Sequence, residues 1–444
     1  MEHLLKFTAT GDCIISRRLH HDSRPDFEPL VNLIKQANAS FANVELVTPG
    51  KPRIPSSEYG GIHLAMPPFV LDELNKTGFN LFNLAHNHAL DFHIPGLVDT
   101  MEELKNRDMM FAGVGRNLGQ ARSPRYLDLP AGRVALIAAT SSFTAGARAG
   151  AKRTDFEGRP GVNPLRFKKQ YVVTEKQMSQ LQQIDEAMGT NETRKRRRDF
   201  GLPPQDQPDA YKFLERPFVI GDEPDVRTSP HQKDVEAICC WIDDASRQAD
   251  LVVMSLHCHQ GPADGTNDDQ PAEFIIESAR AFIDAGADVF VGHGPHMLRG
   301  IEIYKGKPIF YSLGNFMFMC ENIEQLPMDM YERYHLSKTE TPADVFDFES
   351  SDEAGKPKAF HADERFWETV LPVCTFHKRE LTKIDMLPVT LQLNKPRTQR
   401  GAPVVADKNH AEKIFENLIE VSAEFATDIQ LVEHDDTIKG RIRL

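Results

Sequence analysis

The chain has 444 residues, a formal net charge of −13 at pH 7 and 40% hydrophobic residues. This content allows a sizeable core, arranged as three domains or as one large α/β core with appendages. The negative charge argues against binding to nucleic acid, because a protein that binds duplexes needs a positive surface.

The N-terminal segment, residues 1–13, is predicted to be a first strand, because it lacks the basic region and long apolar stretch of a signal peptide. No apolar run approaches the roughly 18 residues that a membrane-spanning helix needs. The six cysteines include no CxxC pair and are too few for a disulfide framework, so reduced thiols are expected. These features predict a cytoplasmic protein with no membrane partner.

Short apolar runs alternate with helical patterns along the chain, which is typical of an α/β fold. We expect strands at residues 4–8, 40–44, 79–84, 110–114, 134–140, 251–256, 289–291 and 308–312. We expect helices at residues 69–77, 96–107, 233–249 and 272–285. Beyond about residue 366, the runs ETVLPVCTF and LTKIDMLPVTLQL predict an antiparallel hairpin, and residues 407–425 predict a closing helix.

Two segments, residues 191–210 and 337–359, have polar, charged or proline-rich compositions that predict less ordered surface excursions or lids. The basic run at residues 194–198 has two interpretations, a phosphate-binding site or the solvated face of a helix. The acidic surroundings favour the solvated face.

Polar side chains gather where five of the expected strands end. In chain order they are Asp12; Asn43 and Glu45; His86, Asn87, His88 and Asp91; His257 and His259; and His293 and His296. The carboxyl ends of the strands in an α/β sheet meet at one edge, so these side chains are expected to build one site.

This mixture of carboxylate, amide and imidazole groups suits Mn²⁺, Fe or Zn²⁺. Six or more candidate ligands exceed one tetrahedral site, so two divalent ions that share a bridging group are expected. Each residue alone has a structural alternative: Asp12 as a turn cap, the HNH run as polar loop tips, and a single histidine as an ordinary one. Their joint occurrence favours a shared metal site.

The same residues lie in motifs that resemble the CapA family, the poly-γ-glutamate capsule synthesis proteins, within the calcineurin-like metallophosphatase superfamily. The motifs occur in family order: GDC, ANVELVTP, NLAHNHALDFHIPGLVDTMEEL, FAGVGRN, VVMSLH, AGADVFVGHGPH and GIEIYKGKPIFYSLGNF. The resemblance implies an α/β fold, a four-layer αββα metallophosphatase-like sandwich with a C-terminal hairpin and helix extension. On this basis we expect a core domain at residues 1–320, with an insertion at about 142–232, and an acidic lid and C-terminal extension at 321–444.

Matched position by position, the resemblance implies a centre of two divalent metal ions, with Mn²⁺ expected and Fe or Zn²⁺ as alternatives. Its implied ligands are Asp12, Glu45, Asn87, His257, His293 and His296. Two departures fall in this region: the family's His-Trp-Gly-Glu motif is HCHQG here, and Gly294 stands where the family has the second of two adjacent histidines. We expect His259 to compensate as a ligand, with a substrate-contacting role as the alternative.

The leading functional prediction is a metal-dependent hydrolase, in which a metal-activated water attacks a phosphoester, ester or amide. His88 and Asp91 are the expected catalytic pair, with Asp91 orienting His88. Arg17 and Arg159 are the expected contacts to a small-molecule or glutamyl-type anionic substrate. The alternative is a non-catalytic accessory or scaffold protein in poly-γ-glutamate capsule synthesis. The sequence does not predict the oligomeric state.

Overall fold

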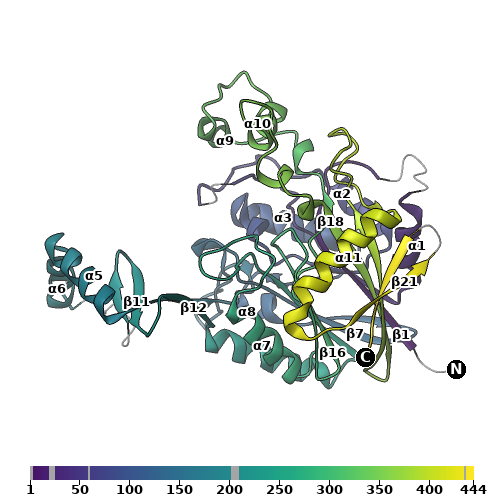
Figure 1. Ribbon diagram of the computed structural model, residues 1–444, viewed down its shortest axis with the longest axis horizontal. Helices are drawn as coiled ribbons and strands as arrows, with labels where there is room; N and C mark the ends of the chain where they lie inside the picture. Colours follow the sequence, from purple (N-terminus) through teal and green to yellow (C-terminus); the bar gives the residue numbers. More distant parts are fainter. Residues whose placement is uncertain (1–3, 20–25, 59–60, 202–209, 435–436) are drawn as a thin grey trace.

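The computed structural model describes residues 4–19, 26–58, 61–201, 210–434 and 437–444, and its fold is mixed α/β (Figure 1). Most strands belong to two large sheets, and a smaller sheet forms part of a projecting arm. Within these described residues, no helix is long and apolar enough to span a membrane.

The larger sheet contains ten strands. Its order is β21 (Ile429–His434), β22 (Thr437–Ile442), β19 (Glu380–Thr390), β18 (Glu368–His377), β1 (Leu4–Ile14), β2 (Ala39–Asn43), β3 (Leu81–Asn83) and β4 (Phe111–Ala112), with β17 (Asn315–Phe318) beside β1 and β20 (Val404–Val405) beside β19. The strands β1 to β4 run parallel to one another. Their carboxyl ends therefore lie at one edge of the sheet.

The second sheet contains six strands. Its order is β15 (Ile301–Tyr304), β16 (Lys307–Phe310), β14 (Val289–His293), β13 (Leu251–His257), β7 (Gly132–Thr140) and β6 (Arg125–Leu129). The strands β7, β13, β14 and β16 are parallel. Every residue of β13 and β14 is buried, which explains why their sequences are continuous apolar runs without alternation.

The two sheets share one hydrophobic core, and each has a second core on its other face. Phe41 and Leu81 of the larger sheet lie in the core shared with Val253 and Val291 of the second sheet. Successive side chains of a strand point to opposite faces, so the next residues lie in two separate clusters, Phe82 in that of the larger sheet and Met254 in that of the second sheet. Each sheet is thus buried on both sides.

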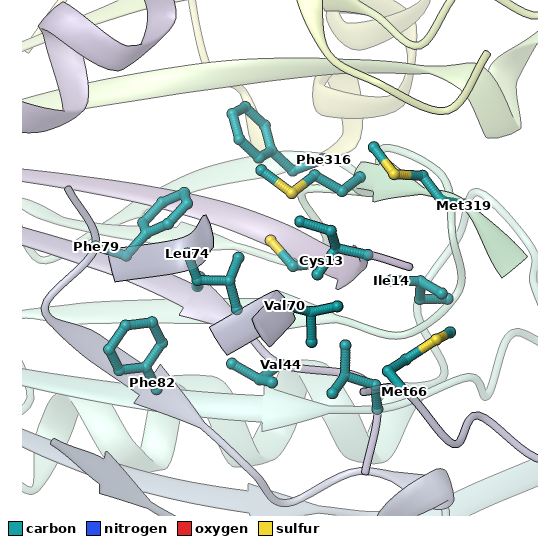
Figure 2. Close-up of a cluster of buried hydrophobic side chains, with 14 of the residues drawn as sticks. Cys13, Ile14, Val44, Met66, Val70, Leu74, Phe79, Phe82, Phe316 and Met319 are labelled. Atoms are coloured by element: carbon teal, nitrogen blue, oxygen red, sulfur yellow. The ribbon is translucent and has the colours of Figure 1, made fainter. Parts of the chain in front are cut away.

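Helices supply the other half of these outer cores. The helices against the larger sheet are α1 (Glu28–Gln36), α2 (Phe69–Thr77) and α3 (His93–Lys105), and those against the second sheet are α7 (Gln232–Ser246) and α8 (Glu273–Asp284). Figure 2 shows part of the first cluster, where Val70 and Leu74 of α2 lie among Cys13, Phe82 and Phe316. The α2 helix ends at Gly78, whose φ of 107° suits glycine and closes the last turn.

The projecting arm lies inside the expected insertion (Figure 1). Its elements are β9 (Phe167–Val173), α5 (Glu175–Ala187), α6 (Thr190–Asp199), β10 (Tyr211–Phe213), β11 (Arg216–Ile220) and β12 (Asp225–Pro230). The predicted helix in the basic run is confirmed as α6, and its Lys195, Arg196 and Arg197 are exposed. Residues 202–209 of the same polar segment lie outside the described residues.

The C-terminal part of the chain is hydrogen-bonded into the larger sheet. The predicted hairpin is confirmed as β18 and β19, and the predicted closing helix is α11 (Lys408–Ser422). Thr8 Oγ1 donates a hydrogen bond to the carbonyl oxygen of Pro372 at 2.7 Å, beside the β1–β18 ladder. Local sequence patterns could not show that this late hairpin pairs with the first strand.

The prediction of low order at residues 337–359 was wrong in part, because α10 (Pro342–Ser350) lies there. A capping box at Thr341 and Asp344 begins this helix, and its Val345 and Phe346 are buried. The remaining short elements are α4 (Leu118–Arg122), α9 (Met328–Arg333), β5 (Val114–Gly115), β8 (Gly161–Val162) and the 3₁₀ helices η1 (Asn87–Leu90), η2 (Ala145–Ala147), η3 (Cys320–Asn322), η4 (Ala359–His361), η5 (Glu364–Trp367) and η6 (Ala423–Phe425).

Candidate metal centre

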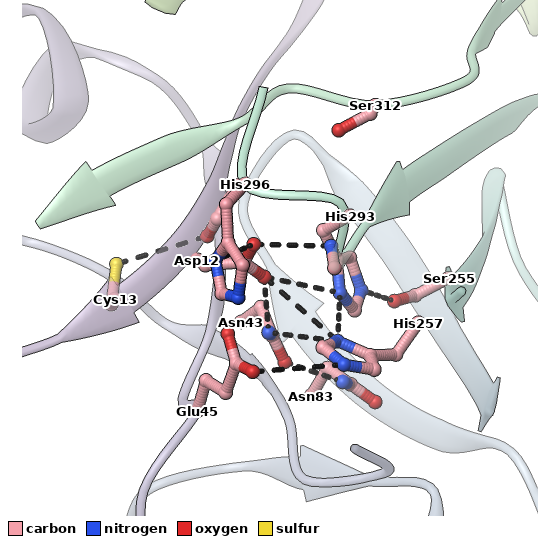
Figure 3. Close-up of polar contacts among 12 residues, drawn as sticks. Asp12, Cys13, Asn43, Glu45, Asn83, Ser255, His257, His293, His296 and Ser312 are labelled. Atoms are coloured by element: carbon pink, nitrogen blue, oxygen red, sulfur yellow. Dashed lines mark hydrogen bonds and ion pairs between the residues drawn. The ribbon is translucent and has the colours of Figure 1, made fainter. Parts of the chain in front are cut away.

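The carboxyl ends of strands from both sheets meet around one cluster of polar side chains (Figure 3). In the larger sheet, the register aligns Asp12 of β1 with Asn43 of β2. In the second sheet, the register aligns His257 of β13 with His293 of β14. The expected convergence of strand ends therefore involves two facing sheets.

Asp12, His257 and His293 form the first group whose potential ligand atoms all lie within 4.8 Å of one another. His293 Nε2 lies 2.8 Å from Ser255 Oγ, so its Nδ1 faces the cluster. This Nδ1 lies 3.0 Å from His257 Nδ1 and 3.6 Å from Asp12 Oδ1. All three side chains are fully buried.

Glu45, His259 and His296 form the second such group. His257 of the first group also contacts the second group, because its Nε2 is 3.1 Å from His259 Nε2 and 3.7 Å from Glu45 Oε1. The same nitrogen lies 2.9 Å from Asn87 Oδ1. All seven side chains predicted to bind metal are thus brought together, and their coordination stays a prediction.

The two carboxylates of the cluster have pKa values displaced in opposite directions. Burial raises the pKa of Glu45 well above its usual range, and the charges of Asp12 and Asp91 act in the same direction. Burial alone would raise the pKa of Asp12 also, but contacts with His296 and His293 outweigh it and lower this pKa to about 2. The ionised form of Asp12 is therefore stabilised by its neighbours, whereas the ionised form of Glu45 is not.

Three imidazoles of the cluster are held neutral by their surroundings. Burial lowers the pKa of His259 to about 3 and that of His293 to about 4. Burial and the neighbouring imidazoles lower the pKa of His257 well below its usual range. Neutral imidazole is the form that binds metal ions, so these three side chains are prepared for ligation.

The residues present fit a divalent cation. Neither carboxylate oxygen of Glu45 has a hydrogen-bond partner among the residues that the structure describes, although this side chain is fully buried. A buried carboxylate without hydrogen bonds is costly, and a coordinated cation would remove that cost. The oxygen and imidazole donors suit Mn²⁺, Fe and Zn²⁺.

Gly294 has a structural reason to lack a side chain. Its φ is 113°, and its amide donates a hydrogen bond to Asp12 Oδ2 at 3.0 Å. A Cβ atom at this position would lie 3.0 Å from the amide nitrogen of Cys258 and 3.2 Å from His257 Cε1. The tight turn therefore brings backbone, and no imidazole, to this corner of the cluster.

His88 and Asp91 form a buried pair next to the cluster. His88 Nδ1 lies 2.8 Å from Asp91 Oδ2, and this oxygen also accepts a hydrogen bond from the amide of Leu64 at 2.8 Å. His88 Nε2 lies 3.9 Å from Glu45 Oε1. The pairing fixes the ring and directs Nε2 towards the cluster, and the catalytic role of the pair stays a prediction.

A cavity of about 490 Å³ opens over the cluster. Its lining includes Asn87, His88, His259 and His296, so a small molecule in this cavity would contact the cluster directly. Cavities of this size are typical of small-molecule sites. The arrangement resembles an active-site pocket with a polar floor.

The comparison with protein families decides the identity of the chain. The model of the family described as bacterial capsule synthesis protein PGA_cap matches residues 6–319. The chain belongs to this family. The match includes every residue of the two candidate ligand groups, from Asp12 to His296. The resemblance to capsule synthesis proteins seen in the sequence is thereby confirmed.

Relatives of this PGA_cap protein carry different names. The uncharacterized protein y4sH of Sinorhizobium fredii is 32% identical over 98% of this chain and 92% of its own length. The capsule biosynthesis protein CapA of Bacillus anthracis is 26% identical over 58% of this chain and 44% of its own length. A probable polyglutamine synthesis accessory protein of Mycobacterium tuberculosis is 25% identical over 54% of this chain and 45% of its own length.

The two arginines predicted to contact substrate lie elsewhere in this PGA_cap protein. Arg17 donates hydrogen bonds to Asn322 Oδ1 at 2.7 Å and to the carbonyl oxygen of Gln399 at 2.6 Å, and so fixes a C-terminal loop. Arg159 is exposed and donates to the carbonyl oxygen of Arg148 at 3.0 Å. Neither is among the described residues that line the cavity. The sequence could not predict these positions, because local sequence does not show which distant groups a guanidinium meets.

Four supporting residues of the PGA_cap site, Asn83, Ser255, Asn267 and Asn315, were not predicted as site residues. Ser255 contacts His293, Asn267 contacts His259 and Asn315 contacts His296. Asn83 donates a hydrogen bond to Asn43, which in turn donates one to Asp12. Three of the four lie in strands whose ends meet at the cluster, so a search for all polar residues near those strand ends would have found these three.

Proposed function

We propose that this PGA_cap protein is a hydrolase that depends on two divalent metal ions, with Mn²⁺ expected and Fe or Zn²⁺ as alternatives. The proposed substrate bond is a phosphoester, ester or amide. The observation that carries the proposal is Glu45, a buried carboxylate that has no hydrogen-bond partner among the described residues. It lies among imidazoles of which two, His259 and His296, line the cavity. A purely structural cluster would be expected to satisfy this group internally.

The arrangement of the sheets supports a metallophosphatase-like sandwich as the finer description of the fold. Two sheets share a core, and helices pack on the outer face of each. We propose residues 1–320 as the catalytic unit, with the insertion at about 142–232, and residues 321–444 as an extension. Contact of Glu349 and Phe360 with the cavity supports a covering role for this later part.

The chain's own residues would divide the chemistry between them. Asp12, Asn87 and the histidines would hold the metal ions, and Glu45 would bridge or bind them. Bound divalent ions would supply Lewis-acid polarisation of the scissile group and lower the pKa of the attacking water. His88, oriented by Asp91, would donate a hydrogen bond or a proton from Nε2 to the oxygen that develops negative charge.

A second candidate function is an accessory or scaffold role in capsule polymer synthesis. The description of the Mycobacterium tuberculosis relative as an accessory protein favours it. Under this alternative the metal ions would stabilise the fold without turnover. A glutamyl-type polymer is the partner expected under this accessory role.

The test begins with the metal content of purified protein and continues with hydrolysis of generic phosphodiesters, esters and small amides. Two ions per chain with turnover of one class would support the hydrolase. Two ions without turnover on any class would support the scaffold. Glu45→Gln should lose at least one ion, because the amide has no charge to compensate the metal.

His88→Asn is the sharper variant for catalysis. We expect it to keep both ions and to lose about 10²–10⁴-fold in kcat, the usual contribution of a general acid. His93→Asn is the matched control, because His93 is exposed and has a φ of 56° that asparagine tolerates. Loss of both ions from His88→Asn would make His88 a ligand and contradict its proposed role.

A further inference from the structure

The cavity over the metal centre has an apolar wall and a polar floor. Its apolar lining includes Ile14, Ile62, Leu64, Phe143, Phe318 and Phe360. Ser142, Thr144, Thr266 and Asn267 add neutral polar groups. None of the described residues that line this cavity is a lysine or an arginine. A ligand that enters it therefore meets rings, aliphatic groups and neutral hydrogen-bonding partners before it reaches the cluster.

Aromatic rings stand next to a histidine of the cluster. The ring centroids of Phe318 and Phe360 lie 5.7 Å and 5.4 Å from that of His296. The two phenylalanine rings meet edge to face at 5.3 Å, and Trp367 supports Phe318 at 5.2 Å. These packed rings form a rigid wall beside the position where the scissile bond would lie.

Three arginines near this wall, Arg17, Arg397 and Arg400, are engaged with protein groups. Arg400 Nε lies 2.6 Å from Glu321 Oε2, and Arg397 forms an ion pair with Asp347. Arg17 donates to Asn322 and to backbone carbonyl groups, as described above. These three guanidinium groups are therefore not prepared to receive the carboxylates of a substrate.

The acidic side chain of this wall, Glu349, does not favour an anionic group of the substrate either. Glu349 lines the cavity, and burial raises its pKa. It offers no positive charge to an anion. The wall residues Cys320, Glu349 and Phe360 also lie beyond the segment that matches the PGA_cap family, which ends at residue 319. Part of this wall thus comes from the region of the chain that follows the matched segment.

We infer that the substrate of this site carries an uncharged, apolar group about the size of an aromatic ring beside the bond held at the metal centre. This inference rests on the proposed hydrolase function and selects a small molecule over a glutamyl polyanion. Burial of a ring against Phe360 and Phe318 removes apolar surface from water. A carboxylate in the same place would lose hydration without gaining a partner.

Binding of three phosphonates tests the inference without relying on turnover. Phenylphosphonate, methylphosphonate and 3-phosphonopropionate share the group that would reach the metal centre and differ in the group that would face the wall. We expect isothermal titration calorimetry of the metal-loaded protein to show phenylphosphonate binding about 10–100-fold tighter than methylphosphonate. The carboxylate-bearing ligand should bind no tighter than methylphosphonate.

The variant Phe360→Ala should reduce the preference for the phenyl group to within about threefold and leave binding of methylphosphonate unchanged. Phe156→Ala is the matched control, because this phenylalanine is 73% exposed. Metal content and thermal melting of each variant establish that the fold and the centre are intact. If Phe360→Ala does not fold, the half-buried Phe143 of the same lining provides the second variant.

Equal binding of the three ligands, or tightest binding of 3-phosphonopropionate, would overturn the inference. Absence of binding by all three would overturn it also. A phenyl preference without turnover of any phosphodiester, ester or amide would overturn the proposed hydrolase and leave the assigned ligand class standing. The two hypotheses therefore fail in different measurements.

Discussion

Arg299 offers a direct test of how the fold holds the metal centre. Its side chain is fully buried. It donates to the carbonyl oxygens of Asp268 at 2.9 Å, Gln260 at 3.0 Å and His259 at 3.3 Å. His259 Nδ1 is held in turn by Asn267 Oδ1 at 2.7 Å, from the same loop. Arg299 therefore fixes the backbone that presents His259 to the cluster.

The expected cost of Arg299→Met follows from these contacts. Hydrogen bonds from a charged donor contribute about 1.5–3 kcal/mol each, so three of them set an upper limit near 5–9 kcal/mol. Burial opposes this gain, and it lowers the pKa of the guanidinium. We expect a net loss of about 3–5 kcal/mol in the free energy of unfolding, the usual cost of removing one partner from a buried charged network.

Urea denaturation followed by circular dichroism would measure this loss. Arg247→Met is the matched control, because the ion pairs of Arg247 lie on an exposed surface and should contribute less than about 1 kcal/mol. The affinity for Mn²⁺ should also fall by about 10–100-fold in Arg299→Met, since the loop that carries His259 would relax. A loss of stability no larger than that of the control, with unchanged metal affinity, would refute this account.

The number of metal ions bound by His259→Ala, measured beside that of His257→Ala, tests whether His259 is a ligand. We expect both variants to lose the same amount of bound metal. Full metal occupancy of His259→Ala with impaired turnover would make His259 a substrate contact. The second prediction concerns Glu321, where burial acts to raise the pKa but contacts with His361 and Arg400 outweigh it and lower the pKa to about 2. Because this lies below the unfolded value of 4.5, the stabilisation is present above about pH 4.5 and is lost as the pH falls towards 2, by roughly 3 kcal/mol. As the pH is lowered from 7 to 3, the melting temperature should fall less for Glu321→Gln than for the unchanged protein. Parallel curves of melting temperature against pH would contradict the proposed stabilisation by the Glu321 carboxylate.

The positions of the main strands and the chemistry at their ends could be predicted from the sequence. Apolar runs such as residues 251–256 and 289–291 predicted buried parallel strands, since both faces of such strands are covered. The first strand was predicted too short, because polar residues interrupt its pattern. It continues to Ile14, so Asp12 lies inside β1.

The order of the strands could not be predicted in the same way. The structure pairs β13 with β14 and aligns His257 with His293. The facing of the two sheets, which brings Asp12 to these histidines, depends on packing between residues far apart in the chain. Such contacts leave no local periodicity in the sequence.

By itself the sequence determined which residue types follow which strands, because side-chain chemistry and local hydrophobic pattern are properties of short segments. Only the tertiary structure decided what those residues meet. It turned Arg17 towards a C-terminal loop and placed Phe360 beside His296. The reason is physical: a guanidinium or a ring is satisfied by whichever groups the folded chain brings within reach, and those groups come from distant segments.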